Sequence, residues 1–325
     1  MKLRIKEIAK IGLFGIVLPW SLAWSIGVFN KEQKPEEMNE IPLTTVQSLQ
    51  PERITHTDFV TVKFQDDTVH KMALDEYVSA VVLAEVPAQF EQEALKAQAV
   101  ATRTYTLRKM EAGKKHTDAD VCTKASCCQA YISEKEYYAR GGTEEDYLNV
   151  CKAVTSTTGE ILMYDGEIVE ATYFSCSGGM TEDAKAVWGG AYPYLIAQPS
   201  PGEEQAGSFA DTVTMEIDEF MDKLGLQGDK GYVVDSITYT SGNGVDEMVI
   251  NGTTFTGVQV RQLLDLRSTV FRITQVGQNV VITTKGYGHR VGMSQYGAEA
   301  MAVAGSDYRE ILAYYYPGTE LTDGR

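Results

Sequence analysis

The spacing of apolar residues predicts a mixed α+β protein. Residues 57–64 alternate apolar and polar positions like a half-buried strand, and residues 65–68 have the composition of a turn. A helix should follow, because a mostly apolar stripe recurs at steps of three and four residues until Pro87 ends the pattern. The stripe consists of Leu74, Tyr77, Val78, Val81, Val82 and Glu85. Its last member is a carboxylic acid on an otherwise apolar face.

Two further helices and a hairpin are expected before residue 200. Residues 88–109 are rich in Ala, Leu and Gln, and residues 143–156 follow a pair of glycines. Residues 160–163 and 168–174 flank Asp165-Gly166, a dipeptide typical of a β-hairpin turn.

The amino-acid composition changes near residue 200, which predicts a domain boundary there. Residues 201–280 are predicted to form a smaller α+β subdomain, inserted into a larger domain made of residues 55–200 and 281–325. Its expected elements are a strand (212–217), a helix (218–224), strands with Asn-Gly turns (243–244 and 251–252), a helix (257–266) and two final strands.

The N-terminus has the pattern of a membrane anchor. Residues 1–10 carry four basic residues against one acid, and residues 11–29 carry no charge. An uncharged stretch of this length can span a hydrocarbon core of roughly 30 Å. We therefore expect a cytoplasmic segment, a single-pass anchor at 11–29, a Pro-containing tether at 30–54, and the remainder outside the cytoplasm. A cleaved signal peptide is the alternative, with Ser21-Leu22-Ala23 as a weak cleavage site.

The charge balance excludes one class of partner. The chain has 29 basic and 45 acidic residues, a net charge of −16. So acidic a protein repels phosphate backbones, and nucleic acid is not expected to bind. The hydrophobic fraction of 43% is that of a globular protein and excludes a fully disordered chain.

Glu85 is the first candidate for chemistry. A carboxylate on a buried helix face has lost contact with water, and near a helix C-terminus it meets the negative end of the helix dipole. Both effects favour the protonated form, which a general acid needs near pH 7. A side chain that reaches solvent or pairs with Arg103 of the next helix is the alternative interpretation, and an ion pair would lower the pKa again.

Several sequence blocks between about residue 55 and the C-terminus carry recognisable motifs. The blocks are Ala84–Phe90 with Glu93–Tyr105, Gln129-Ala130-Tyr131, Tyr173-Phe174-Ser175 with Ser177-Gly178-Gly179, and Gly288–Ala298. These blocks, in this order, resemble the stage II sporulation protein D family. The anchor matches as well, whereas much of 208–280 carries no motif of the family.

This resemblance implies a peptidoglycan lytic transglycosylase of forespore engulfment. Members cleave the bond between N-acetylmuramic acid and N-acetylglucosamine in strands stripped of stem peptides, and leave a 1,6-anhydro end. Glu85 would be the catalytic acid, followed here by Val86 where the family usually has Met. The implied partners are an amidase/endopeptidase that supplies stripped strands and a multi-span membrane protein, on the mother-cell side of the sporulation septum.

A single carboxyl group suits this chemistry. Ordinary glycosidases use two, one as acid and one as nucleophile or base. A lytic transglycosylase uses the 6-hydroxyl of the sugar as the second nucleophile, so one Glu can serve as acid and then as base. The sequence shows no second acid in a motif near Glu85; Glu91 and Glu93 are close in sequence and are expected to be solvated.

The glycine-rich motif near the C-terminus is a candidate substrate contact. Glycines allow the backbone to approach a ligand closely, and Ser, Gln and Tyr suit sugar hydroxyls and ring faces. The resemblance favours substrate binding by Ser294, Gln295 and Tyr296 over a purely structural crossing. Tyr173 and Arg103 join them, the latter to bind a lactyl carboxylate or to orient Glu85. His289 is considered as a base, although a lone His is more often structural.

Three of the five cysteines lie within residues 122–128 and suggest a metal site. His116, Cys122, Cys127 and Cys128 make a plausible tetrahedral set for a structural zinc. A Cys122–Cys128 disulfide and free thiols are the alternatives, because an external location permits oxidation.

Two other functions compete with glycan cleavage by Glu85. One is a non-catalytic activator of a cell-wall amidase, since a related group of proteins shares the glycine-rich motif. The other is a zinc hydrolase, which a thiolate-rich site does not favour.

Overall fold

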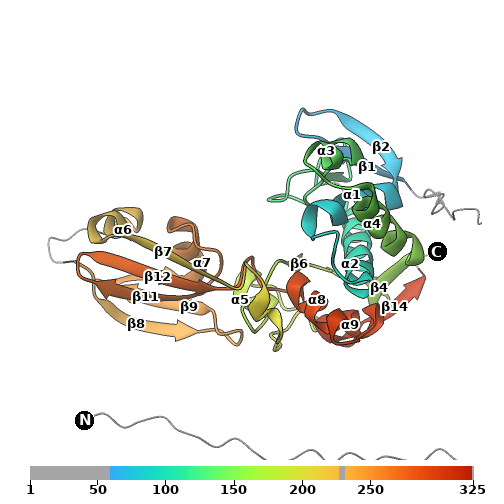
Figure 1. Ribbon diagram of the computed structural model, residues 1–325. Helices are drawn as coiled ribbons and strands as arrows, with labels where there is room; N and C mark the ends of the chain where they lie inside the picture. The colour runs from blue at the N-terminus through green and yellow to red at the C-terminus, as the bar shows by residue number, and fades with distance from the viewer. Residues whose placement is uncertain (1–58, 114, 227–230, 324–325) are drawn as a thin grey trace, which may run out of the picture. The chain divides into compact units, whose positions relative to one another are not determined.

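The computed structural model describes residues 59–113, 115–226 and 231–323, and they form an α+β structure with two hydrophobic cores. The expected anchor at 11–29 and the expected tether at 30–54 both fall outside these residues. Within them, no helix is both long enough and apolar enough to span a bilayer. Figure 1 shows the elements of both cores.

The larger core is built by residues from both ends of the described chain. Its helices are α1 (Leu74–Glu85), α2 (Gln92–Glu111), α3 (Glu134–Ala139), α4 (Glu144–Ser156), α5 (Ala184–Trp188), α8 (Gln295–Val303) and α9 (Tyr308–Tyr315). Its strands are β1 (Phe59–Lys63), β2 (Val69–Ala73), β3 (Val121–Cys122), β4 (Glu160–Tyr164), β5 (Glu167–Ile168), β6 (Tyr173–Phe174), β13 (Met293–Ser294) and β14 (Glu320–Asp323).

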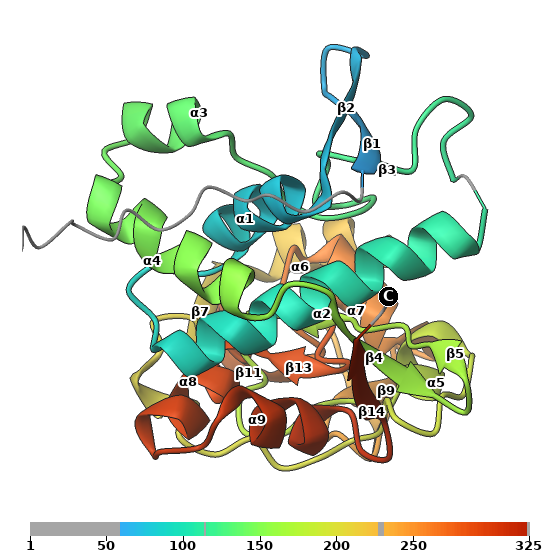
Figure 2. The ribbon, with the colours of Figure 1, turned by 90° about the vertical axis from the view of Figure 1, so that its right-hand side faces the viewer.

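Helix α2 is the centre of this core. In Figure 2 it runs between α1 and α4 on one side and α8 and α9 on the other. Small side chains allow this close approach, because Ala94, Ala97 and Ala101 are all buried. Helix α1 ends at Glu85, as the sequence predicts, and Val86 before Pro87 takes an extended backbone.

Short strands bring distant segments together. Strand β6 pairs in parallel with β13, so that Tyr173 lies opposite Met293. Strand β3 pairs in parallel with β1, whereas β14, β4 and β5 form an antiparallel sheet. The hairpin expected over 160–174 is therefore shorter than predicted: its second strand is β5 alone, and β6 belongs to another sheet.

The second core gathers apolar residues between Met215 and Ile282. The sheets β11-β12-β7 and β10-β9-β8 surround it together with two short helices. The elements are β7 (Ala210–Glu216), α6 (Ile217–Lys223), β8 (Val234–Tyr239), β9 (Val245–Ile250), β10 (Thr253–Thr256), α7 (Gly257–Leu263), β11 (Val270–Val276) and β12 (Asn279–Lys285). Both Asn-Gly turns form as expected, with Asn243 and Asn251 at positive φ.

Candidate active site

Glu85 lies at the C-terminal end of α1, and its carboxyl group is held by the loop before α3. Its Oε1 atom accepts a hydrogen bond from the backbone N–H of Ala130 at 2.8 Å. The side chain is half-buried. The position combines shelter from water with access to a ligand, as a general acid requires.

Burial raises the pKa of Glu85, in the direction that the sequence predicts. Loss of water is the largest cause, and the hydrogen bond from Ala130 and the side chain of Gln295 oppose it. The Gln295 side chain is itself buried, and its Nε2 atom has no well-directed acceptor within the described residues. A polar group near the acid is thus left available to a ligand.

Arg103 does not pair with Glu85, which corrects one of the two interpretations above. Its guanidinium is buried and binds Asp75 of α1, with Nη2 to Oδ1 at 2.9 Å. It also donates to the backbone carbonyls of Val154 and Glu160. These bonds join α2 to α1, α4 and β4, and they leave Arg103 without the exposure that a substrate contact needs.

The three candidates at the start of α8 differ in their placement. Ser294 is fully buried and accepts a hydrogen bond from the N–H of Gly297, so it caps the helix and does not suit the expected substrate contact. Gln295 faces Glu85 as described above. The Tyr296 ring packs edge-on against Phe90, with ring centroids 5.2 Å apart.

Tyr173 lies beside the acid. Its hydroxyl oxygen accepts a hydrogen bond from Nε2 of Gln129 at 2.6 Å. Burial, and second the negative charge of Glu85, raise the pKa of Tyr173 far above its usual range. The phenol therefore stays protonated and can donate a hydrogen bond.

His289 is neutral and fixed in place. Its Nδ1 atom accepts the N–H of Val291 at 3.1 Å, and its ring packs against Trp188 and Phe174. Burial, with a contribution from Arg261, lowers the pKa of His289 to about 4. Such a weak base, with one nitrogen already engaged, fits a structural role.

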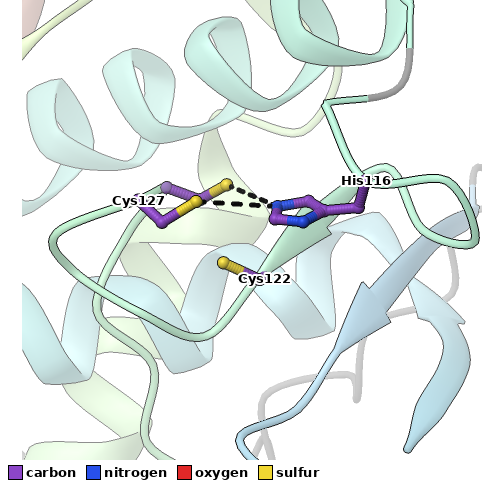
Figure 3. Close-up of side chains that lie close together, drawn as sticks. His116, Cys122 and Cys127 are labelled. Carbon is purple, nitrogen blue, oxygen red and sulfur yellow. Dashed lines mark hydrogen bonds between the residues drawn. The ribbon is translucent and has the colours of Figure 1, made fainter. Parts of the chain in front are cut away.

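The four candidate metal ligands converge. The ligand atoms of His116, Cys122, Cys127 and Cys128 all lie within 4.8 Å of one another. Figure 3 shows the sulfur atoms of Cys122 and Cys127 facing the imidazole of His116. Nε2 of that ring lies 3.5 Å from Sγ of Cys128 and 3.8 Å from Sγ of Cys127.

These separations fit a tetrahedral zinc. With Zn–S bonds of about 2.3 Å and a Zn–N bond of about 2.0 Å, ligand atoms stand roughly 3.5–3.8 Å apart. All five cysteines are free thiols in this structure. The set could hold a structural zinc, with the loop between α2 and β3 supplying His116, β3 supplying Cys122, and the loop between β3 and α3 supplying Cys127 and Cys128.

A buried ion pair joins the glycine-rich motif to the segment before α5, and the sequence does not predict it. Arg290, at a positive φ, binds Glu182 at 2.7 Å, and both side chains are 1% exposed. The N–H of Gly242 also donates to Glu182, and Arg290 donates to the carbonyl of Gly242. Arg290 lies within the block Gly288–Ala298 that resembles the family, but nothing in the sequence identifies its partner.

The chain is similar to known sporulation proteins, both by family model and by sequence identity. Residues 64–164 match the sequence model of SpoIID, described as stage II sporulation protein. The chain is 39% identical over 263 residues to stage II sporulation protein D of Bacillus subtilis (strain 168), covering 79% of this chain and 77% of the relative. The same protein of Bacillus amyloliquefaciens is 38% identical over 261 residues, covering 79% and 76%. The chain therefore belongs to the stage II sporulation protein D family.

The family likeness extends to a protein with a different name. The amidase enhancer of Bacillus subtilis (strain 168) is 31% identical over 303 residues. This alignment covers 75% of the present chain but 40% of that relative.

Proposed function

We propose that the protein is a peptidoglycan lytic transglycosylase with Glu85 as its sole general acid and base. One observation carries the proposal: a half-buried carboxyl group of raised pKa at a helix end, held by the Ala130 amide and facing the side chain of Gln295. Membership of the family supports a role in sporulation, and within sporulation the proposed role is in engulfment.

The reaction needs only this one carboxyl group. The Glu85 acid protonates the glycosidic oxygen between N-acetylmuramic acid and N-acetylglucosamine as the C1–O bond breaks. The resulting carboxylate then accepts the proton of the 6-hydroxyl, whose oxygen bonds to C1 and closes the 1,6-anhydro ring. Glu85 ends protonated again, and no water is consumed. Strands stripped of stem peptides are the proposed substrate, with an amidase/endopeptidase as their source.

The proposed setting is the outer face of the cell membrane, on the mother-cell side of the septum. An anchor at 11–29 would tether the protein there, beside a multi-span membrane protein of the same machinery. Zinc, if bound at the His/Cys cluster, would stabilise the loop that leads to Ala130 without taking part in the reaction.

Replacing Glu85 tests the assignment. Glu85→Gln keeps the shape of the side chain and removes its transferable proton, so formation of anhydro ends should fall at least roughly 100-fold to 10,000-fold. Mass spectrometry of digested, peptide-free glycan strands measures this. Glu91→Gln is the matched control, because Glu91 is exposed and close in sequence, and it should cleave like wild type. Normal turnover by folded Glu85→Gln protein would disprove the role of Glu85.

The second candidate is a non-catalytic, glycan-binding activator of a cell-wall amidase, which the likeness to the amidase enhancer favours. The same experiment separates the two functions. An activator would yield no new glycan ends with any variant and would raise the rate of an added amidase, whereas reducing ends without anhydro ends would indicate a hydrolase.

A further inference from the structure

The segment Cys127–Ala130 leads directly from the His/Cys cluster to the catalytic acid. Cys127 and Cys128 belong to the cluster, and the amide of Ala130 binds Glu85. Gln129 lies between them and is 3% exposed. The mechanism above gives this residue no task.

Gln129 has a partner on each side of its amide group. Its Oε1 atom accepts a hydrogen bond from the hydroxyl of Thr106 at 3.0 Å, with the hydroxyl of Tyr77 at 3.5 Å. Its Nε2 atom donates to the hydroxyl oxygen of Tyr173 at 2.6 Å. Tyr173 is thus the acceptor in this bond and keeps its own proton, and the side chain of Thr102 is a further hydrogen-bonding partner of its hydroxyl.

The strand that carries Tyr173 also leads to the other group near the acid. Tyr173 begins β6, which pairs with β13 immediately before Gln295. Adjacent residues bind Tyr173 and the acid, because Gln129 donates to the Tyr173 hydroxyl and the backbone N–H of Ala130 donates to Glu85. The Tyr173 hydroxyl therefore stands beside the carboxyl group, where Gln129 fixes it.

We propose that Gln129 is a positioning residue of this site: it holds the Tyr173 hydroxyl beside Glu85 so that the phenolic proton points to an oxygen of the bound saccharide. An acetamido carbonyl or a ring hydroxyl is the acceptor that this chemistry suits. The next residue, Ala130, holds Glu85 itself, so one dipeptide sets the spacing between donor and acid. The saccharide as ligand rests on the proposed function; the positioning of Tyr173 does not.

A double-mutant cycle tests this inference. Gln129→Met keeps the length of the side chain, removes the donor, and leaves Thr106 its bond to the carbonyl of Thr102. Misplacement of the hydroxyl should lower kcat for glycan cleavage by about 10-fold to 100-fold with little change in KM. The double variant with Tyr173→Phe should be no slower than Tyr173→Phe alone, because Gln129 acts through Tyr173.

A matched control separates positioning from general damage. Gln92→Met makes the same substitution in α2, where the amide donates to Asn149 and not to the site. It should keep the wild-type kcat even if it melts earlier. The inference is wrong if the losses in kcat of the two single variants multiply in the double variant. It is also wrong if folded Gln129→Met protein keeps the wild-type kcat.

A measurement without substrate keeps the inference separate from the proposed function. In protein labelled at the tyrosine Cζ carbon, the Tyr173 resonance, identified by its absence in Tyr173→Phe, should shift in Gln129→Met and stay in place in Gln92→Met. An unmoved resonance in Gln129→Met rejects the positioning role. Wild-type protein that leaves glycan uncut would instead reject the proposed function, and the resonance would still decide the role of Gln129.

Discussion

At the scale of single residues, Glu85 combines two opposing environments. Burial raises its pKa, whereas the Ala130 amide and the Gln295 side chain lower it. The net rise keeps a larger fraction of the acid protonated near neutral pH than an exposed glutamate would. The amide bond meanwhile limits the rotation of the carboxyl group, so the acid is available and oriented at once.

This environment predicts how activity and stability depend on pH. A free glutamic acid has a pKa of about 4.3. Because the folded value is higher, the group contributes stability below that pH and loses this contribution as pH rises through the folded pKa. Wild-type protein should therefore lose stability relative to Glu85→Gln as pH increases, and glycan cleavage should decline over the same range. Urea unfolding at several pH values, beside a pH–rate profile, measures both.

The comparison with Glu91→Gln makes this test specific. Glu91 is exposed and close to Glu85 in sequence, so its substitution removes a carboxyl group without changing a buried environment. If the unfolding free energy depends on pH in the same way for Glu85→Gln as for Glu91→Gln, then the raised pKa of Glu85 is wrong, whatever its role in cleavage.

At the scale of elements, the segment 127–130 connects the His/Cys cluster to Glu85. A metal bound at the cluster can therefore affect catalysis although it does not lie at the reacting bond. Zinc at His116, Cys122, Cys127 and Cys128 would fix the start of this segment, and the end of the segment carries the Ala130 amide. Without a bound cation, the pKa of Cys128 is raised to about 12, mainly because the thiol is buried. This shift disfavours the thiolate. A cation reverses this balance because it stabilises the thiolate directly.

Metal removal should therefore lower both stability and turnover. Protein purified without added zinc is expected to hold one zinc per chain, and Cys127→Ser should weaken its affinity at least about 10-fold. Its melting temperature and its rate of glycan cleavage should both fall. Cys151→Ser is the control, since Cys151 lies in α4 outside the cluster, and it should bind zinc normally. Much less than one zinc per wild-type chain, with a thiol count that indicates a disulfide, would refute the site.

Elements with strong local signals could be predicted from the sequence. The apolar stripe and Pro87 define α1 and place Glu85 at its end, and the Asn-Gly pairs mark two hairpin turns. Helix α3 was missed because none of its residues is buried, so it has no apolar stripe; its capping box of Ser133 and Glu136 was the available signal.

Long-range partners could not be predicted in the same way. Arg103 sits on an inward face as expected, but its partner is Asp75 at the start of α1 instead of Glu85 at the end. Strand β6 likewise pairs with β13, 120 residues further along the chain, and not with its neighbour. Periodicity describes which face of an element is buried, and it carries no information about what lies opposite.

At the scale of the whole described structure, the buried pair of Glu182 and Arg290 links the two cores. Both residues flank the larger core, and the β8–β9 turn of the second core completes their hydrogen bonds. Gly242 of that turn has no room for a side chain, because an added Cβ would lie 2.4 Å from the carbonyl oxygen of Thr181. The fit is therefore specific to glycine.

Breaking this pair should be costly. Glu182→Gln leaves Arg290 buried without a counter-charge, and the expected loss in unfolding free energy is about 3–5 kcal/mol. Replacing both residues by apolar side chains should recover much of it, since no charge then remains buried. Equilibrium urea unfolding measures the difference. Glu219→Gln, at an exposed pair with Lys223, should change stability by less than about 1 kcal/mol; an equally small effect of Glu182→Gln would contradict the expected cost.

The Gly242 turn also bears on how far the protein can be shortened. The segment from β7 to β12 has its own core and looks suitable for deletion without harm to the rest. Its removal, however, would strip Glu182 and Arg290 of the peptide groups that solvate them. Arg290 lies two residues after Gly288, so the glycine-rich motif would lose this support as well. A minimal version of this protein should therefore keep the segment or redesign that ion pair along with it.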